Sequence, residues 1–253
     1  MQMFLAGGGI WAWVLPPPPP QERRAILSPA EDINILESFY YADDVITALI
    51  PYLHNFMLDS GAFTFFTQGK HVDWDEYVSK YIEYIKQNKI KLYIELDIDS
   101  LIGYEKVKQI RKRLEREIGY PPIPVWHKSR GKNEFLRMCD EYDYVAIGGI
   151  VSKEIRLQDY KYFPWFINEA HKRGAKIHGL GFTNLAGLKI YHFDSVDSSS
   201  WTTGNRFGKI YTFDGKDLVI TDKPPNTRVK ARETALNNFN EWVKFAKYAE
   251  THF

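Results

Sequence analysis

The chain has 253 residues, of which 44% are hydrophobic and 15% aromatic, so it can bury a substantial core. Its 33 Lys and Arg against 32 Asp and Glu leave almost no net charge, so a nucleic-acid partner would need a local basic surface. Cys139 is the only cysteine, which excludes an internal disulfide and a cysteine-rich zinc site and suits a reducing cytoplasm. The apolar N-terminal segment follows no basic region and ends in prolines, so we expect neither a signal peptide nor a membrane span.

Short apolar or β-branched runs recur along the chain and predict strands at 3–6, 35–42, 56–60, 91–97, 124–127, 144–149, 176–181 and 189–194. Amphipathic spacing predicts helices at 74–86, 104–118, 133–141 and 160–173, and a last helix at about 228–251. Strands that alternate with helices indicate a parallel sheet. Eight of them in about 250 residues favour a (β/α)8 TIM barrel forming a single domain over residues 1–253. Residues 212–220 predict a hairpin with an Asp-Gly turn.

Active sites of such barrels lie at the C-terminal ends of the strands. The predicted strand ends carry acids, imidazoles and glycines: Asp59, Asp97, His127, Gly148, Gly149, His178, and Asp194 or Asp197. Helix capping is the commoner explanation for any one Asp. Convergence on one mouth explains the whole set better, because the same coincidence would otherwise recur at five strand ends.

Some of these features also have a purely structural explanation. A single strand histidine such as His127 is more often a structural hydrogen-bonding residue. The Gly148-Gly149 pair either allows tight packing at the rim or lets backbone N–H groups approach a planar ligand. Residues 198–208, which include Trp201 and Arg206, form either a flexible loop or a lid that grips substrate.

Four segments, in family order over residues 59–208, resemble the tRNA-guanine (queuine) transglycosylase superfamily. Residues 59–63 (DSGAF) are similar to that family's DSGGF, 148–154 to GGLxxxE, 178–183 (HGLGFT) to MGVGTP, and 193–196 (FDSV) to FDCV. FLAG, ESFYYA, LDSGAF, PVWH, GLGFT and VDSSSW resemble more closely the phage-encoded, DpdA-like DNA-guanine transglycosylases. The resemblance implies an enzyme that exchanges guanine in DNA for a 7-deazaguanine such as preQ0. It also implies the cytoplasm, which is the host cytoplasm if the chain is phage-encoded.

The resemblance assigns roles to individual residues. Asp59 would transfer protons. The covalent nucleophile is Asp194 in the FDCV register and Asp197 in the VDSSSW register; the two lie on opposite faces of one strand, and we prefer Asp197. Asp97 would accept hydrogen bonds from the base, surrounded by Phe63, His127, Gly148, Gly149, Ile150, His178 and Gly179. The family's CxCxxC…H zinc subdomain has no counterpart here, so we expect no metal and no cofactor.

The expected partners are DNA and a 7-deazaguanine base as co-substrate, and a homodimer is left open. Phosphate contacts are assigned to Lys128, Arg130, Lys132, Trp201, Arg206, Arg228 and Lys230, although a solvated surface explains each basic cluster equally simply. Three alternatives stay open: the same exchange on tRNA, a non-catalytic nucleic-acid-binding barrel subunit, and a metal-dependent hydrolase. The lack of a zinc subdomain favours DNA, and the retained acids argue against the non-catalytic subunit.

Overall fold

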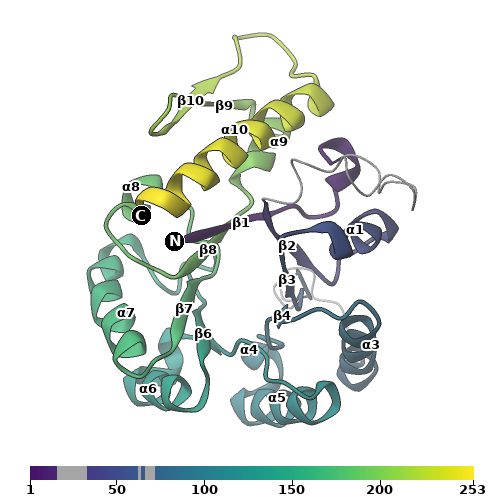
Figure 1. Cartoon of the computed structure of the whole chain (residues 1–253), viewed down its shortest axis with the longest axis vertical. Helices are drawn as coiled ribbons and strands as arrows, with labels where there is room; N and C mark the ends of the chain where they lie inside the picture. Colours follow the sequence, from purple (N-terminus) through teal and green to yellow (C-terminus); the bar gives the residue numbers. More distant parts are fainter. Residues whose placement is uncertain (16–32, 62–63, 66–71) are drawn as a thin grey trace.

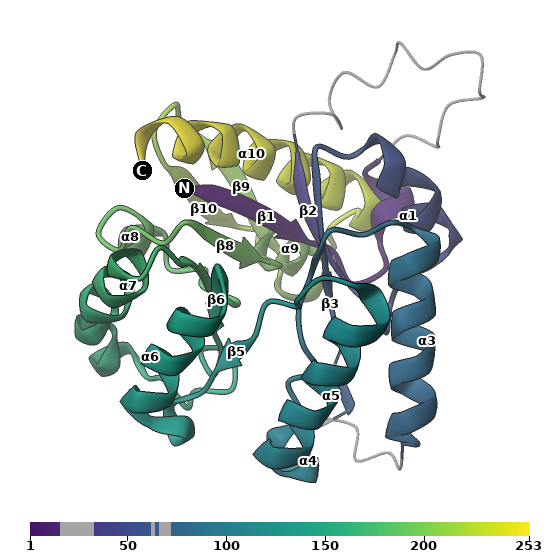
Figure 2. The same ribbon diagram turned by 60° about the horizontal axis from the view of Figure 1, so that its bottom comes forward.

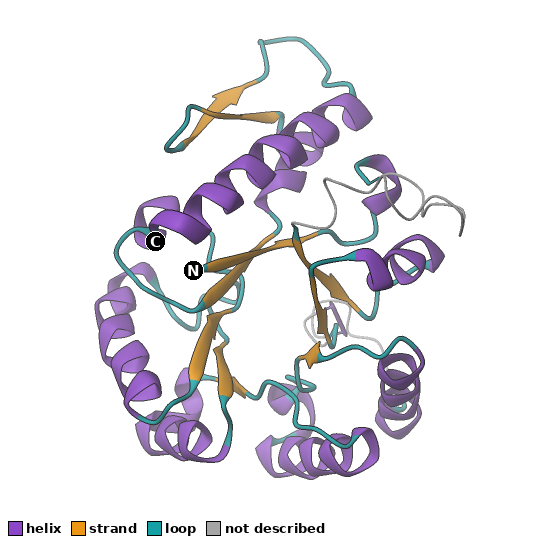
Figure 3. Ribbon diagram, viewed as in Figure 1, coloured by secondary structure: helices purple, strands orange, loops and turns teal. Residues whose placement is uncertain are grey.

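The computed structural model describes residues 1–15, 33–61, 64–65 and 72–253, and its centre is a curled sheet of eight parallel strands (Figures 1 and 3). The strands are β1 (Gln2–Ala6), β2 (Asn34–Ser38), β3 (Asn55–Asp59), β4 (Leu92–Tyr93), β5 (Val125–Trp126), β6 (Tyr144–Ile147), β7 (Lys176–Gly179) and β8 (Ser195–Ser198). Their order is β4-β3-β2-β1-β8-β7-β6-β5, and a parallel bridge between Ile94 and Ile123 joins the two ends of the sheet. The predicted (β/α)8 barrel is confirmed.

Helices surround the ring of strands. They are η1 (Trp11–Trp13), α1 (Asp44–Leu49), η3 (Ile50–Tyr52), α3 (Trp74–Gln87), α4 (Asp99–Ile102), α5 (Tyr104–Ile118), η4 (Lys128–Arg130), α6 (Gly131–Glu141), η5 (Leu157–Tyr162), α7 (Phe163–Lys172), α8 (Leu185–Leu188), η6 (Ser200–Thr202), α9 (Thr203–Phe207) and α10 (Ala231–His252). Asp43 and Asp73 cap α1 and α3, their side chains each accepting a backbone N–H at 3.0 Å. In the described part of the chain, no helix is long and apolar enough to cross a membrane.

Most predicted elements lie where expected, but the eighth strand does not. Residues 189–194 form the turn after α8, and the strand is the more polar Ser195–Ser198, in which all four residues are buried. Backbone pairing fixes this position, because Gln2 N donates to Asp194 O at 2.8 Å and Asp197 pairs with Phe4 of β1. The apolar residues that suggested a strand, such as Phe193, are buried from the turn instead.

Two apolar layers follow from the alternation of side chains along the strands. Met57 of β3 faces the inside of the ring, where it clusters with Phe4, Leu36, Ile94, Ile123, Val125 and Ala146. Its neighbours Phe56 and Leu58 belong to the larger layer between strands and helices. Two residues beyond Met57, Asp59 therefore shares its inward face.

An antiparallel hairpin of β9 (Lys209–Phe213) and β10 (Leu218–Asp222) follows the ring, as predicted, with its turn at Asp214-Gly215. The long C-terminal helix α10 packs on β9 and β1 (Figure 2). It begins at Ala231, three residues later than expected.

Trp201 joins this C-terminal part to the barrel. Its side chain is fully buried, with ring centroids 5.7 Å from Trp11 and 5.2 Å from Phe239 of α10, and its Nε1–H donates to Ala6 O at 2.9 Å. The expectation that Trp201 contacts nucleic acid is therefore wrong. An indole with its whole surface and its N–H occupied inside the protein has nothing to offer a ligand.

Replacing Trp201 with Ala should lower the free energy of unfolding by about 3–5 kcal/mol, because it removes a fully buried aromatic side chain. Urea denaturation followed by circular dichroism measures this loss. Trp13→Ala is the matched control, since Trp13 is 39% exposed and should cost under about 1 kcal/mol. Equal losses in the two variants would show that Trp201 does not anchor α10.

Candidate active site

Asp59 ends β3 and faces the mouth of the barrel. Its Oδ2 accepts a hydrogen bond from Gly61 N at 2.9 Å, in a turn that needs glycine because Gly61 has φ +77° and a Cβ would meet Ser38 Oγ at 2.8 Å. Burial raises the pKa of Asp59 to about 7; the Gly61 hydrogen bond opposes this, and the negative charges of Asp197 and Asp97 add to it. Asp59 is therefore poised to gain or lose a proton near neutral pH.

Asp197 lies on β8 and is 8% exposed. Its Oδ1 lies 2.6 Å from Gly181 N and 3.2 Å from His178 Nε2. His178 Nδ1 lies 2.5 Å from Ser195 Oγ, which also contacts the Tyr144 hydroxyl. A carboxylate at Asp197 can only accept, so the row of hydrogen bonds from Tyr144 to Asp197 has one consistent direction. His178 donates from Nε2 and accepts at Nδ1. Buried behind Asp197, His178 orients this carboxylate and does not reach the mouth, contrary to its expected contact with the base.

Asp194 lies at the other end of β8. Its Oδ2 accepts from Ile177 N at 2.8 Å and pairs with His171 Nε2 of α7 at 2.9 Å. Since it precedes β8, it faces the N-terminal side of the sheet. The structure thus brings Asp197, and not Asp194, to the end of the barrel where Asp59 lies.

His127 connects two acids on the opposite side of the mouth. Its Nε2 lies 2.6 Å from Asp97 Oδ1 and its Nδ1 lies 2.8 Å from Glu154 Oε2. Burial by itself would lower the pKa of His127, but its hydrogen bonds and charge interactions with these carboxylates outweigh burial and raise it to about 9. At neutral pH the imidazolium therefore donates to both.

The Gly148-Gly149 pair makes room for this arrangement. A Cβ on Gly148 would lie 2.9 Å from the His127 ring, and a Cβ on Gly149, which has φ +82°, would lie 2.8 Å from Glu154 Oε2. Ile155 N donates to Gly149 O at 2.9 Å and closes the loop. The spacing from the glycines to Glu154 in this motif thus has a structural reason: the glycines leave room for the contact between His127 and Glu154.

Arg130 is buried, contrary to the predicted phosphate contact. Its side chain is 2% exposed, with Nε 3.1 Å from Asp99 Oδ2, Nη1 3.3 Å from Glu95 Oε1 and Nη2 3.7 Å from Asp97 Oδ1. Fully buried Glu95 also pairs with Arg111, at 2.6 Å. Arg130 thus neutralises acids below the mouth and is closed to a phosphate.

Ligand atoms of Asp97, Asp99 and His127 lie within 4.8 Å of one another, so this group could in principle hold a metal ion. The donor set fits a metal poorly. Both His127 ring nitrogens are already hydrogen-bonded to carboxylates, and the Arg130 guanidinium lies against both Asp97 and Asp99. The arrangement suits an ion-pair network, and the absence of a bound metal stays a prediction.

The other predicted site residues lie in varied positions. Ile150 is half-buried beside Gly149, Gly179 is buried against Phe182 and Val196, and Phe63 lies outside the described residues. Five basic residues predicted to contact nucleic acid are at the surface: Lys128, Lys132, Arg206, Arg228 and Lys230. Lys128 and Lys230 pair there with Asp159 and Glu233.

Sequence reasoning missed Ser38 at the end of β2. It lies two residues beyond the inward-facing Leu36 and pairs with Asp59 of β3. Its Oγ is buried and has no hydrogen-bond partner among the residues that the structure describes. An unpartnered polar atom beside Asp59 makes Ser38 a further candidate residue of this site. The period-2 alternation of the strand would have indicated that Ser38 faces inward, but only once the strand register was known.

The fold and the inward-facing acids define an α/β barrel with a carboxylate-lined mouth. No protein-family profile matches the chain. It is 24% identical over 197 residues to uncharacterized protein 306 of Sulfolobus islandicus rod-shaped virus 1, a match that covers 74% of this chain. The chain spans 62% of the viral protein's length. A solved structure of QR15, an aldolase, aligns with a TM-score of 0.46 at 14% identity over 71% of this chain and 84% of the aldolase.

The coupling between Asp59 and Asp197 can be measured directly. Asp197→Asn should lower the pKa of Asp59 below about 7, because it removes a negative charge that favours the protonated form. Carboxyl ¹³C NMR titration of the folded protein reports this midpoint. Asp194→Asn is the matched control and should leave it unchanged. An unaltered midpoint in Asp197→Asn would mean that the two acids do not share one site.

Proposed function

We propose that this chain is a transglycosylase that exchanges guanine in DNA for a 7-deazaguanine base such as preQ0, through a covalent Asp197–sugar intermediate. One observation carries the proposal: Asp59 and Asp197 reach the same mouth from β3 and β8, and the charge of one acts on the pKa of the other. No Lys or Arg of the described segments pairs with either acid. This differs from Asp97 and Asp99, which Arg130 neutralises.

Asp197 has the geometry of a nucleophile. The two hydrogen bonds that Asp197 accepts from the described residues, from Gly181 N and His178 Nε2, both fall on Oδ1, so Oδ2 is the oxygen that would attack. Oδ2 forms a bond to C1′ of the nucleotide while the bond from C1′ to N9 of guanine breaks. The sugar becomes oxocarbenium-like in this step, and an anionic mouth stabilises it.

Asp59 has the pKa for the proton transfers. Protonated Asp59 gives its proton to the departing guanine, and the resulting carboxylate takes a proton from N9–H of the incoming base. That nitrogen then attacks C1′ and releases Asp197. A pKa of about 7 makes both forms accessible at neutral pH, as a group that serves alternately as acid and base requires.

Substrate recognition would use the other side of the mouth. Asp97 accepts hydrogen bonds from N1–H and the amino group of guanine, held in place by the His127 imidazolium at 2.6 Å. Extruding the base from a duplex costs roughly a few kcal/mol, which contacts to the backbone must offset. The surface residues Lys128, Lys132, Arg206, Arg228 and Lys230 are available for those phosphate contacts.

Asp197→Asn should abolish exchange of labelled preQ0 into DNA, because an amide is a far weaker nucleophile than a carboxylate. Asp59→Asn should slow exchange about 10²–10⁴-fold by removing the proton carrier. Mass spectrometry of digested nucleosides measures both rates. A denaturing gel tests for a covalent complex in Asp59→Asn that is missing in Asp197→Asn.

Asp194→Asn is the control and should retain exchange, since Asp194 lies at the opposite end of β8. Running DNA and tRNA in parallel separates the two substrates, and exchange on tRNA alone would move the proposal to RNA. Full activity in Asp197→Asn would remove covalent catalysis from β8 and with it the main support for a transglycosylase.

A further inference from the structure

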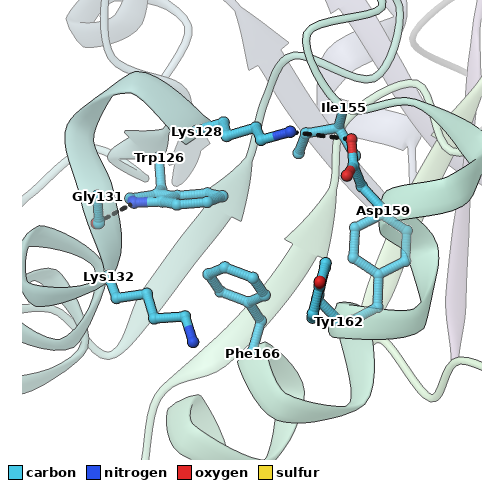
Figure 4. A pocket seen from close by; sticks show the side chains of 9 residues that line it. Trp126, Lys128, Gly131, Lys132, Ile155, Asp159, Tyr162 and Phe166 are labelled. Atoms are coloured by element: carbon cyan, nitrogen blue, oxygen red, sulfur yellow. Dashed lines mark hydrogen bonds and ion pairs between the residues drawn. The ribbon is translucent and has the colours of Figure 1, made fainter.

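A hollow of about 280 Å³ lies outside the ring of strands, between the loops that follow β5 and β6 (Figure 4). Trp126 and Phe166 line it, but they are only 3% and 7% exposed, so their rings present almost no surface. Lys128, at its rim, already pairs with Asp159 at 3.1 Å. The hollow therefore offers little to a ligand, and the hairpin of β9 and β10 offers more to a partner.

The hairpin lies at the margin of the molecule, next to α10 (Figure 1). One face of it packs on the helix. The ring centroids of Tyr211 and Trp242 are 5.5 Å apart, and those of Phe213 and Phe245 are 6.3 Å apart. With this face covered, the two edges of the hairpin decide what else it can bind.

The outer edge of β9 is occupied by side chains of α10. Asn238 Oδ1 accepts from Tyr211 N at 3.0 Å, and Glu241 Oε2 accepts from Phe213 N at 2.6 Å. Asn237 Nδ2 donates to Tyr211 O at 3.0 Å. The backbone groups of Tyr211 and Phe213 therefore point away from β10 and are satisfied within the chain.

The outer edge of β10 is open. Directly opposed residues of an antiparallel pair point their backbone groups either both toward the partner strand or both away from it. Ile220 opposes Tyr211 and Leu218 opposes Phe213, so their N–H and C=O groups point away from β9. Those of Asp222, two residues further on, do the same. Within the described residues, no turn or loop backbone bonds to these groups.

The open edge also has the composition of a strand that pairs. Val219, Ile220 and Thr221 are β-branched, which favours strand structure. Val219 is 44% exposed and Ile220 is 49% exposed, so apolar surface accompanies the unpaired backbone. An exposed edge with these properties is a template for a strand from another chain.

We infer that β10 pairs with β10 of a second copy of this chain, antiparallel and around a two-fold axis at Ile220. Only residues whose backbone groups point outward can lie on such an axis, which leaves Leu218, Ile220 and Asp222. An axis at Asp222 would oppose two carboxylates and bring Pro224, which has no N–H, into the ladder. An axis at Leu218 would run into the turn at Asp214-Gly215. The axis at Ile220 uses the whole edge of both copies.

The charges at the ends of β10 agree with this axis. Counting outward from Ile220, Asp217 of one copy opposes Lys223 of the second copy, and the two-fold axis repeats the pair at the other end. Asp217 is 42% exposed in its side chain and pairs with Lys189, while Lys223 Nζ donates to Thr227 O. Both groups are thus at the surface, and opposite charges on facing strands stabilise the pairing.

Sedimentation equilibrium of the full chain over a range of concentrations tests the inference. Two five-residue strands make an interface well below the roughly 1,200–2,000 Å² of standard complexes, so we expect a dimer that dissociates on dilution. Ile220→Pro should leave a monomer at every concentration. The Ile220 N–H points away from β9, so the hairpin itself should persist, and circular dichroism checks that the variant is folded.

Exchanging the end charges tests the axis. Asp217→Lys and Lys223→Asp should each weaken dimerisation about ten-fold or more, because like charges then face each other. The double variant Asp217→Lys/Lys223→Asp restores opposite charges and should dimerise nearly as well as the wild type. A double variant that is weaker than both single variants would overturn the axis at Ile220.

Cross-linking gives a direct readout of the same axis. In Ile220→Cys the two thiols would lie on residues about 5.5 Å apart at Cα, a separation that a disulfide can bridge. Val219→Cys is the matched control, since it is similarly exposed but opposes Thr221 of the second copy. Cys139 is buried and should not react. Under mild oxidation only Ile220→Cys should give a covalent dimer.

A wild type that stays monomeric up to its solubility limit would overturn the inference and leave the open edge to a strand of another protein. Equal cross-linking of the two cysteine variants would overturn it as well. None of these measurements uses nucleic acid, and neither Asp59 nor Asp197 lies in the hairpin. Dimerisation can therefore fail while base exchange holds, and the reverse.

Discussion

A closed ring of parallel strands sends alternate side chains inward, and this constraint decides which acids of the chain can meet. Met57 and Asp59 share the inner face of β3, as Ser195 and Asp197 share that of β8. Asp194 falls outside this pattern and serves the packing of α7 on the barrel through His171. A shift of one residue in the register of β8 would turn Asp197 away from the inner face, so the backbone pairing of β8 with β1 fixes which acid reaches the mouth.

The acids at the mouth lie in two different electrostatic environments. Around Asp97, cations offset the cost of burying charge: Arg130 and the His127 imidazolium contact it, and Arg111 holds Glu95 below. Asp59 has no such cation within the described segments, and its cost of burial appears as a pKa raised to about 7. The side with Asp97 is therefore a fixed network of paired charges. The side with Asp59 can change its protonation state, which the proton transfers that we propose require.

Two properties decide which parts of the fold and site can be predicted from the sequence: the length of the side chain and the polarity of the strand. Short acids and glycines at strand ends, such as Asp59 and Gly149, were placed correctly because their position follows from the backbone. The strand Ser195–Ser198 was missed because three of its four residues are polar, although all are buried. Arg130 and Trp201 have long side chains that can fold inward or outward, and only the acids and rings around them decide which.

The inside of the barrel is polar near β6, β7 and β8, beside an inner cluster of apolar residues that includes Phe4, Leu36 and Met57. His178, Ser195 and Tyr144 fill it in a hydrogen-bonded chain that ends at Asp197, and the ring of Phe4 packs edge-on against His178 at 6.1 Å. Buried polar groups add no stability over well-packed apolar ones and are costly when one partner is lost. These hydrogen bonds hold Asp197 Oδ1 toward Gly181 and His178, and we infer that this orientation, not stability, is the reason for the buried polar residues. A carboxylate fixed on one oxygen presents the other in a single direction, and the nucleophilic attack that we propose for Asp197 requires such an orientation.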